Sequence, residues 1–192
     1  MGNASQIIIA ILIVGAIITY SEFIAPKRVE QKSQDLNITE LQKLIHEQIN
    51  IQRRSYGLKT LNYDERLTQI ATEHSKDMIE RQFFDHINPD GEDPTDRGLR
   101  AGYECVKNYG TYYESGLAEN LFQNNLFDSV TYTNGIPSYD WNTLEKIAET
   151  TVNRWMNSLG HRQNILTPTF RVEGLGIASA SEGQVYITQI FC

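Results

Sequence analysis

The stretch Trp155-Met156-Asn157-Ser158-Leu159-Gly160-His161-Arg162-Gln163-Asn164-Ile165-Leu166 places a histidine beside a glycine, where a long helix is expected to stop. Apolar residues recur at helical spacing before it, which predicts a helix from about residue 141 or 143 to residue 159. Gly160 then ends that helix, because glycine tolerates the backbone conformation common at helix C-termini. His161 is therefore predicted to follow the helix directly, where it can face another part of the chain.

Two upstream segments contain possible companions for His161. Phe83-Phe84-Asp85-His86 brings a histidine just past an amphipathic helix, and Leu117-Ala118-Glu119-Asn120-Leu121-Phe122 brings one acid inside an otherwise apolar run. Together these segments resemble the CAP superfamily, named for cysteine-rich secretory proteins, antigen 5 and pathogenesis-related plant proteins, and especially its single-domain bacterial and archaeal branch. The resemblance covers roughly Thr39 to Cys192. Further motifs in the family's order are Glu73-His74-Ser75-Lys76-Asp77-Met78, Asn88-Pro89-Asp90-Gly91, Ala101-Gly102-Tyr103 and Gly174-Leu175-Gly176.

The residue pattern predicts an α+β fold. Helices are expected after a cap at Thr39 and after a cap at Asp64. Residues 172–180 and 184–191 alternate as strands around a short turn, which predicts a hairpin, and residues 117–123 form a further candidate strand. The family resemblance implies a three-layer α-β-α sandwich with a small antiparallel sheet. Residues 124–141 are predicted to be a long polar and aromatic loop. It could border the central cleft that the family resemblance implies.

The resemblance also implies that the positions of His86, Glu119 and His161 meet in a central cleft. Two imidazoles and a carboxylate suit a divalent cation such as zinc, with a fourth position left for water. The family's second glutamate, three residues after the helix tryptophan, is here Ser158, which is a poor base and a poor zinc ligand. We therefore predict His86, Glu119 and His161 as metal ligands and name none of them as catalytic.

Other interpretations of these residues stay open. A hydrogen-bonded structural cluster of the same three residues is the main alternative to a metal or ligand site. A Ser158–His161–Glu119 triad is disfavoured, because no Gly-x-Ser-x-Gly turn surrounds the serine. His74 shares the apolar face of its helix and is predicted to be a buried core histidine, whereas His46 lies off the apolar stripe and is predicted to be solvated.

The N-terminal part of the chain indicates a membrane segment. Residues 7–24 are almost entirely apolar, and this length lies at the lower edge of the roughly 17–25 residues that span a bilayer. We predict a transmembrane helix that serves as an anchor or signal segment in residues 1–25, a linker in residues 26–37 and the CAP domain in residues 38–192. No Ala-x-Ala-like cleavage site follows the apolar run, which favours an uncleaved anchor.

Three features bear on which side of the membrane the domain lies. The basic pair Lys27-Arg28 after the apolar run, taken alone, favours a domain that stays inside. Cys105 and Cys192 are the only cysteines, and a disulfide between them would indicate an oxidising compartment, although two buried thiols fit the sequence nearly as well. Because the family resemblance also implies export, we expect a membrane-anchored, extracytoplasmic domain, or a secreted one if the segment is cleaved.

Charge narrows the choice of partner. The chain has 17 basic and 24 acidic residues, for a net charge of −7, and no basic cluster, so nucleic acid is not an expected partner. The predicted function is a non-catalytic cleft that binds a divalent metal or a small or polymeric extracellular ligand, such as a lipid, polysaccharide or peptide. The alternatives are a metal-dependent, peptidase-like hydrolase of peptides or cell-envelope polymer, and an adhesion or signalling module that uses the outer surface.

Overall fold

A four-stranded sheet runs through the middle of the domain in the order β1-β7-β8-β4. The computed structural model describes residues 36–108 and 110–192. The strands of this sheet are β1 (Asn62–Tyr63), β4 (Ala118–Asn125), β7 (Val172–Ser179) and β8 (Gln184–Phe191). Strands β7, β8 and β4 pair in antiparallel fashion, which confirms the predicted hairpin, whereas the two-residue strand β1 pairs with β7 in parallel.

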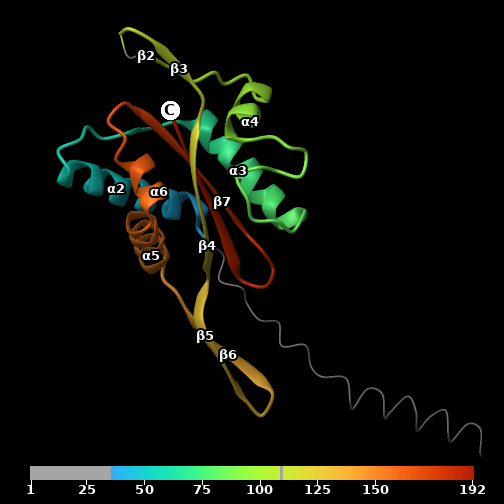
Figure 1. Ribbon diagram of the computed structural model, residues 1–192. Helices are drawn as coiled ribbons and strands as arrows, with labels where there is room; N and C mark the ends of the chain where they lie inside the picture. Colours follow the sequence, from blue (N-terminus) through green and yellow to red (C-terminus); the bar gives the residue numbers. More distant parts are fainter. Residues whose placement is uncertain (1–35, 109) are drawn as a thin grey trace, which may run out of the picture. The chain divides into compact units, whose positions relative to one another are not determined.

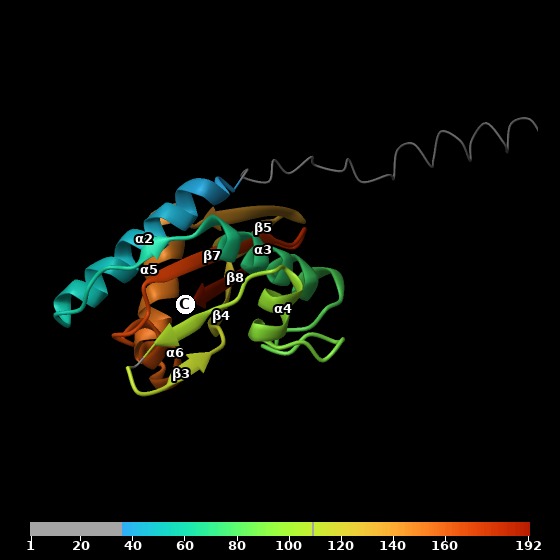
Figure 2. The same ribbon diagram turned by 90° about the horizontal axis from the view of Figure 1, so that it is seen from above.

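Helices cover both faces of the sheet (Figures 1 and 2). One layer contains α2 (Ile38–Ser55), α5 (Leu144–Asn157) and α6 (Leu159–Ile165). The other contains α3 (Glu65–Glu80) and α4 (Pro94–Arg100). This arrangement is the α+β, three-layer order expected from the sequence. Strand β4 is the last strand of the sheet, so its free edge lies between the two helical layers.

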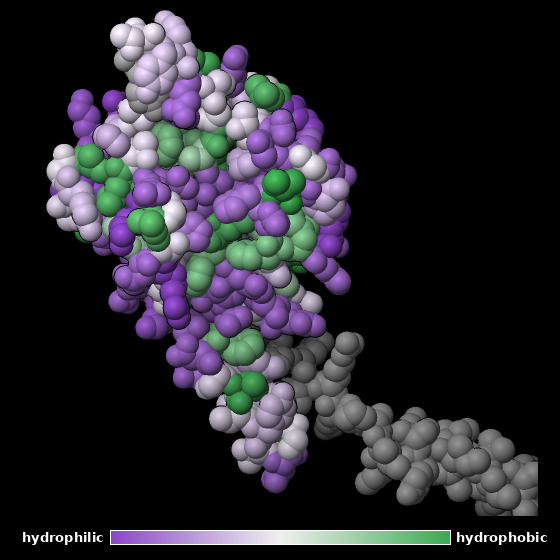
Figure 3. Space-filling model, viewed as in Figure 1, coloured by the Kyte–Doolittle hydropathy of each residue, from purple (hydrophilic) through white to green (hydrophobic). Residues whose placement is uncertain are grey.

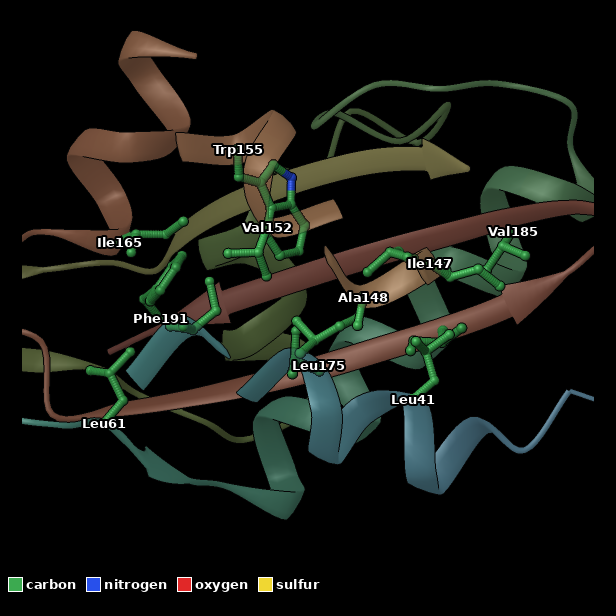
Figure 4. Close-up of a cluster of buried hydrophobic side chains, with 14 of the residues drawn as sticks. Leu41, Leu61, Ile147, Ala148, Val152, Trp155, Ile165, Leu175, Val185 and Phe191 are labelled. Carbon is green, nitrogen blue, oxygen red and sulfur yellow. The ribbon is translucent and has the colours of Figure 1, made fainter. Parts of the chain in front are cut away.

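The main hydrophobic core lies between the sheet and the layer of α2 and α5. Figure 4 shows Trp155 and Val152 of α5 above the sheet residues Leu175 and Phe191. The Trp155 side chain is fully buried, and its indole N–H donates a hydrogen bond to the Leu121 carbonyl at 3.1 Å. Burying each such large apolar side chain contributes about 1.5–3 kcal/mol, so this core fixes α5 against β4.

Two glycines of β7 allow α3 to approach the opposite face of the sheet. A Cβ atom on Gly176 would lie 2.0 Å from the Ala71 carbonyl carbon, and one on Gly174 would lie 2.2 Å from the Thr68 nitrogen. No side chain fits in that space, since real Cβ atoms stay well beyond these distances. The Gly174-Leu175-Gly176 motif is therefore explained by the close packing of helix on strand.

Helix ends follow the sequence in part. Asp64 caps α3, as predicted, by accepting hydrogen bonds from the backbone N–H groups of Arg66 and Leu67, whereas Asn37 rather than Thr39 caps α2. The prediction that one helix continues to Gly160 is wrong. Helix α5 ends at Asn157, because Ser158 has an extended backbone (φ −96°, ψ 127°) and a new helix, α6, starts at Leu159.

The segment predicted as a long loop forms a β-hairpin instead. Strands β5 (Phe127–Thr133) and β6 (Ile136–Trp141) pair in antiparallel fashion around Asn134-Gly135. Both turn residues have positive φ, 53° and 78°, the combination that a tight hairpin turn requires. The hairpin extends away from the rest of the domain (Figure 1), so it does not border the sheet edge at which β4 begins. A second short pair, β2 (Val106–Asn108) and β3 (Tyr113–Ser115), lies nearer that edge.

Cys105 and Cys192 form a disulfide, which settles the choice between a cross-link and two thiols. Within residues 36–108 and 110–192, no helix is long and apolar enough to cross a membrane. The predicted anchor in residues 1–25, and the linker as far as residue 35, lie outside the described residues.

Candidate functional site

The Glu119 carboxylate is the centre of the predicted site. It extends from β4 toward the layer of α3 and α4, and its side chain is only 1% exposed. One oxygen lies 2.8 Å from His86 Nδ1 and the other 2.6 Å from Arg97 Nη2. Because an ionised carboxylate only accepts hydrogen bonds, both nitrogens donate. The sequence placed Glu119 and His86 together correctly, but Arg97 was not foreseen.

Arg97 also holds the loop that carries His86. From α4, its Nη1 donates to the backbone carbonyls of His86 at 2.8 Å and Glu92 at 2.9 Å. The Arg97 residue is 3% exposed, so its charge is neutralised mainly by Glu119. The sequence did offer a signal, because Asp93 and Asp96 form a capping box that starts a short helix just before Arg97.

Helix α6 is fastened to β4 by side-chain amides. Asn164 donates to the Glu119 carbonyl at 3.1 Å and to the Asn120 side chain at 2.9 Å. In return, Asn120 donates to the His161 carbonyl at 3.2 Å. The register between the helix and the strand is thereby set from both directions, so His161 keeps a fixed place beside the strand that carries Glu119.

A buried arginine fixes the far end of α6. Arg53 of α2 is fully buried and donates to the carbonyls of Lys59, Ile165 and Thr167 at 2.6–3.0 Å. Burial lowers the pKa of its guanidinium, although the nearby Glu173 carboxylate acts in the opposite direction. The role of Arg53 could not be predicted from its helix alone, because Ile165 and Thr167 are far away in the sequence.

The two histidines have pKa values that shift in opposite directions. The hydrogen bond to Glu119 raises the pKa of His86 above its usual 6.5. Burial, and then the charge of His86, lower the pKa of His161. His86 is therefore the more readily protonated ring, and His161 the more readily neutral one.

Exposed apolar side chains adjoin both histidines in the sequence. Phe84 is 47% exposed and Ile87 54% exposed on either side of His86, and Leu159 is 64% exposed just before His161. Figure 3 shows hydrophobic patches set among a mainly hydrophilic surface. A ligand at the histidines could thus make both polar and apolar contacts.

The sequence predicted the surroundings of His74 correctly but not those of His46. His74 is buried, as predicted, and its Nε2 lies 3.0 Å from the Asp85 carbonyl. The prediction that His46 is solvated is wrong. Its Nδ1 lies 2.6 Å from the buried Glu173 carboxylate, and its Nε2 accepts from Asn50 at 3.1 Å. The partner Glu173 belongs to β7 and is remote in sequence, which is why the helical pattern gave no sign of it.

The arrangement limits how a metal ion could bind. Among the described residues, no group of three or more His, Cys, Asp and Glu side chains is placed to hold a metal ion. Both Glu119 oxygens already accept hydrogen bonds, from His86 and Arg97. Direct coordination by Glu119 would require it to give up one of these hydrogen bonds, and the predicted metal ligands His86, Glu119 and His161 stay a prediction.

The fold agrees with comparisons to known proteins. The model of the CAP, cysteine-rich secretory protein family matches residues 46–191, and the chain belongs to this family. It is 29% identical to the uncharacterized protein YkwD of Bacillus subtilis over 80% of this chain and 48% of YkwD. It is also 27% identical to the uncharacterized membrane protein YlbC of the same organism, over 88% of this chain and 39% of YlbC.

A solved structure supports the same fold. An extracellular protein from Bacillus anthracis that contains an SCP domain superposes with a TM-score of 0.55 at 24% identity, over 80% of this chain and 40% of that protein. The chain spans less than half the length of each of these three relatives.

Proposed function

We propose that this chain is an extracytoplasmic binding domain that takes one divalent metal ion, such as zinc, through His86 and His161. In this proposal Glu119 orients His86 from behind and does not bind the ion. The description of the B. anthracis relative as extracellular supports the location, as does the disulfide between Cys105 and Cys192.

The hydrogen bond between His86 and Glu119 carries the proposal. Because Nδ1 of His86 donates to Glu119 at 2.8 Å, the lone pair of the neutral ring is on Nε2. Metal-binding histidines almost always donate their other N–H group to a carboxylate or carbonyl in this way. The His86 side chain is 48% exposed, so it remains accessible to an ion from solvent.

The same contacts favour binding over hydrolysis. Glu119 is poorly suited to act as a general base, because its carboxylate is buried and paired with the Arg97 guanidinium. The residue three positions after Trp155, where the family has its second glutamate, is Ser158, which directly precedes α6 and is a poor base. A bound ion would supply open coordination positions for water or for a polar group of a small or polymeric ligand.

Zinc titration by calorimetry on the oxidised full-length chain tests the proposal. We expect one ion per chain, and binding that is abolished or greatly weakened by His86→Ala and by His161→Ala. Glu119→Gln should weaken binding by about 10–100-fold, as expected for an outer hydrogen-bond partner. His46→Ala is the matched control, since His46 also pairs with a buried glutamate, and this variant should bind as the wild type does.

Two results would contradict the proposal. Absence of binding to the wild-type chain would remove the metal site. Equal binding by the His86→Ala and wild-type chains would place the ion elsewhere.

A metal-dependent hydrolase is the second candidate, favoured by the opposite pKa shifts of His86 and His161. In the chain without metal, the ring that tends to stay protonated and the one that tends to stay neutral form a possible acid and base. With an ion bound, both rings would be ligands and a metal-bound water would be the nucleophile. Incubating the zinc-loaded chain with peptides and with cell-envelope polymer tests this candidate. Turnover that His161→Ala abolishes would support it, and no turnover would exclude it for these substrates.

A further inference from the structure

A row of buried polar side chains crosses the sheet on the side of α2, α5 and α6. Glu173 of β7, Gln189 of β8 and Asn120 of β4 are each 0% exposed. Asn120 and Gln189 lie directly opposite each other where β4 pairs with β8. The core on this side is otherwise largely apolar, and apolar side chains of the same shape would stabilise it about as well. The row is therefore expected to have a use besides stability.

The hydrogen bonds of the row run in one direction. Gln189 Nε2 donates to one oxygen of Glu173, and Gln189 Oε1 accepts from Asn120 Nδ2 at 3.0 Å. Asn120 Oδ1 accepts in turn from Asn164 Nδ2 of α6 at 2.9 Å. Gln189 and Asn120 thus each turn the NH2 group toward the carboxylate end of the row and the oxygen toward the next donor.

The charge of Glu173 fixes this direction. An ionised carboxylate only accepts hydrogen bonds, so Gln189 must present its NH2 group to it. The Gln189 oxygen then faces β4 and can only accept, so Asn120 must present its own NH2 group in return. Turning the Asn120 amide over would bring two oxygens together. A charge on β7 therefore sets the orientation of an amide on β4, two strands away.

The Asn120 end of the row holds the backbone on both sides of the candidate site. The Asn120 NH2 group also donates to the His161 carbonyl at 3.2 Å, and Asn164 donates to the Glu119 carbonyl at 3.1 Å. A reversed Asn120 amide would point its oxygen at the His161 carbonyl oxygen and its NH2 group at that of Asn164. Because two acceptors or two donors do not hydrogen-bond, α6 would lose part of its attachment to β4.

The other end of the row is closed by His46. Asn50 accepts from the Leu61 N–H through its oxygen, and its NH2 group donates to His46 Nε2 at 3.1 Å. The ring proton is therefore on Nδ1, which donates to the second oxygen of Glu173 at 2.6 Å. Glu173 must thus accept from a donor on each side, which a carboxylate can do and a neutral amide cannot.

We propose that Glu173, Gln189 and Asn120 are positioning residues for His161. They contact no ligand, but the charge of Glu173 holds the amides in the one orientation that attaches α6 to β4. His161 is thereby kept at a set place relative to the strand that carries Glu119. This role rests on the proposed function, because a fixed His161 serves a metal ion that two histidines hold together.

The isosteric change Glu173→Gln tests the direction of the row. The new amide must turn its oxygen toward the His46 proton and its NH2 group toward Gln189, which reverses the row. Adding His46→Ala removes that constraint, so the amide can turn its oxygen back toward Gln189. NMR spectra of the metal-free, oxidised full-length chain compare the wild type, the two single variants and the double variant.

We expect Glu173→Gln to shift the amide signals of residues 159–165 and the ring signals of His161. His46→Ala alone should leave these signals close to those of the wild type, because the Glu173 charge is kept. The double variant should return them toward the wild type. Unchanged signals in Glu173→Gln would overturn the proposal, as would equal shifts in Glu173→Gln and in the double variant.

Asn120→Ala is a second variant, which keeps the hydrogen bond between Glu173 and Gln189. It removes the side-chain donor to the His161 carbonyl, so it should shift the same signals even if Glu173→Gln does not fold. Wild-type signals for α6 and His161 in this variant would also overturn the proposal.

Zinc calorimetry on the same chains separates the positioning role from the proposed function. We expect Glu173→Gln to weaken binding by about tenfold, as for an outer hydrogen-bond partner, and the double variant to recover it. If the wild type binds zinc through His86 and His161 but Glu173→Gln binds equally well, the positioning role fails and the proposed function stands. If the wild type binds no zinc, the proposed function fails, and the NMR comparison alone decides whether the row positions His161.

Discussion

The two faces of the sheet each hold a buried glutamate paired with a histidine, and the pairs differ in what surrounds the imidazole. On the face of α3 and α4, Glu119 binds His86, whose side chain is 48% exposed. On the face of α2 and α5, Glu173 binds His46, whose side chain is 21% exposed. Both carboxylates are at most 1% exposed, so burial of the acid does not distinguish a candidate site from a structural pair.

The second nitrogen of each imidazole makes the distinction. Nε2 of His46 accepts a hydrogen bond from Asn50, which also binds the backbone of Leu61 in both directions, so this pair is closed. His86 receives no comparable side-chain bond on Nε2 among the described residues. The second partner of each glutamate differs as well. Glu119 pairs with the charged Arg97 guanidinium, whereas Glu173 accepts a hydrogen bond from the neutral Gln189 amide. The first pair thus leaves one imidazole nitrogen open to solvent, whereas the second joins helix to strand.

Removing each glutamate should give the largest difference between the two faces. Glu119→Ala leaves the Arg97 charge buried without its partner and should lower the free energy of unfolding by about 3–5 kcal/mol. Glu173→Ala breaks no direct pair with a guanidinium, only the bonds from His46 and Gln189, and should cost about 1–3 kcal/mol. Urea unfolding of the oxidised proteins measures both. A double variant with Arg97→Met should recover part of the Glu119→Ala loss, and no recovery would show that the Arg97 charge is not the cause.

Replacing the histidines should reverse the order of the stability losses, with the larger loss on the face of α2 and α5. His46→Ala leaves one oxygen of the buried Glu173 carboxylate without its donor, while Gln189 still donates to the other, and should cost about 1–3 kcal/mol of stability. His86→Ala should cost less than about 1 kcal/mol, because water can reach the half-exposed position and replace the bond. The same unfolding experiment compares them. If His86→Ala proves the more destabilising change, the pair with Glu119 is primarily structural.

The pH dependence of zinc binding should sharpen the comparison further. Protons compete with the ion for His86, whose pKa is raised above 6.5 by Glu119. Affinity should therefore rise with pH, by up to about tenfold or ~1.4 kcal/mol per unit, until the pH exceeds that raised pKa. The stability that protonated His86 gives is fully present below pH 6.5, and it is lost as the pH rises from there through the raised pKa of His86.

Calorimetry at several pH values checks this prediction. In Glu119→Gln the pKa of His86 should fall, so affinity should level off at a lower pH. Binding that does not change with pH would mean that His86 is not a ligand.

Several parts of the fold could be predicted because their signals are local. Asp64 caps α3 through backbone groups two and three residues away, and the alternation in residues 184–191 describes a strand beside a turn. The β5–β6 hairpin was missed although Asn134-Gly135 between aromatic residues is a local signal for it. The break at Ser158 was also missed, because helical periodicity continues across it.

The sequence by itself determined the α+β class and the core face of α5, because periodicity acts within short segments. The three layers and the candidate residues His86, Glu119 and His161 followed from the resemblance of its motifs to the CAP family. Only the tertiary structure decided what those residues can do. The partnership of Glu119 with Arg97 joins β4 to α4, and that of His46 with Glu173 joins α2 to β7. Hydrogen bonds between such distant segments depend on packing and register. Only the folded structure therefore distinguishes His86, which has a free ring nitrogen, from His46, whose two ring nitrogens are both hydrogen-bonded.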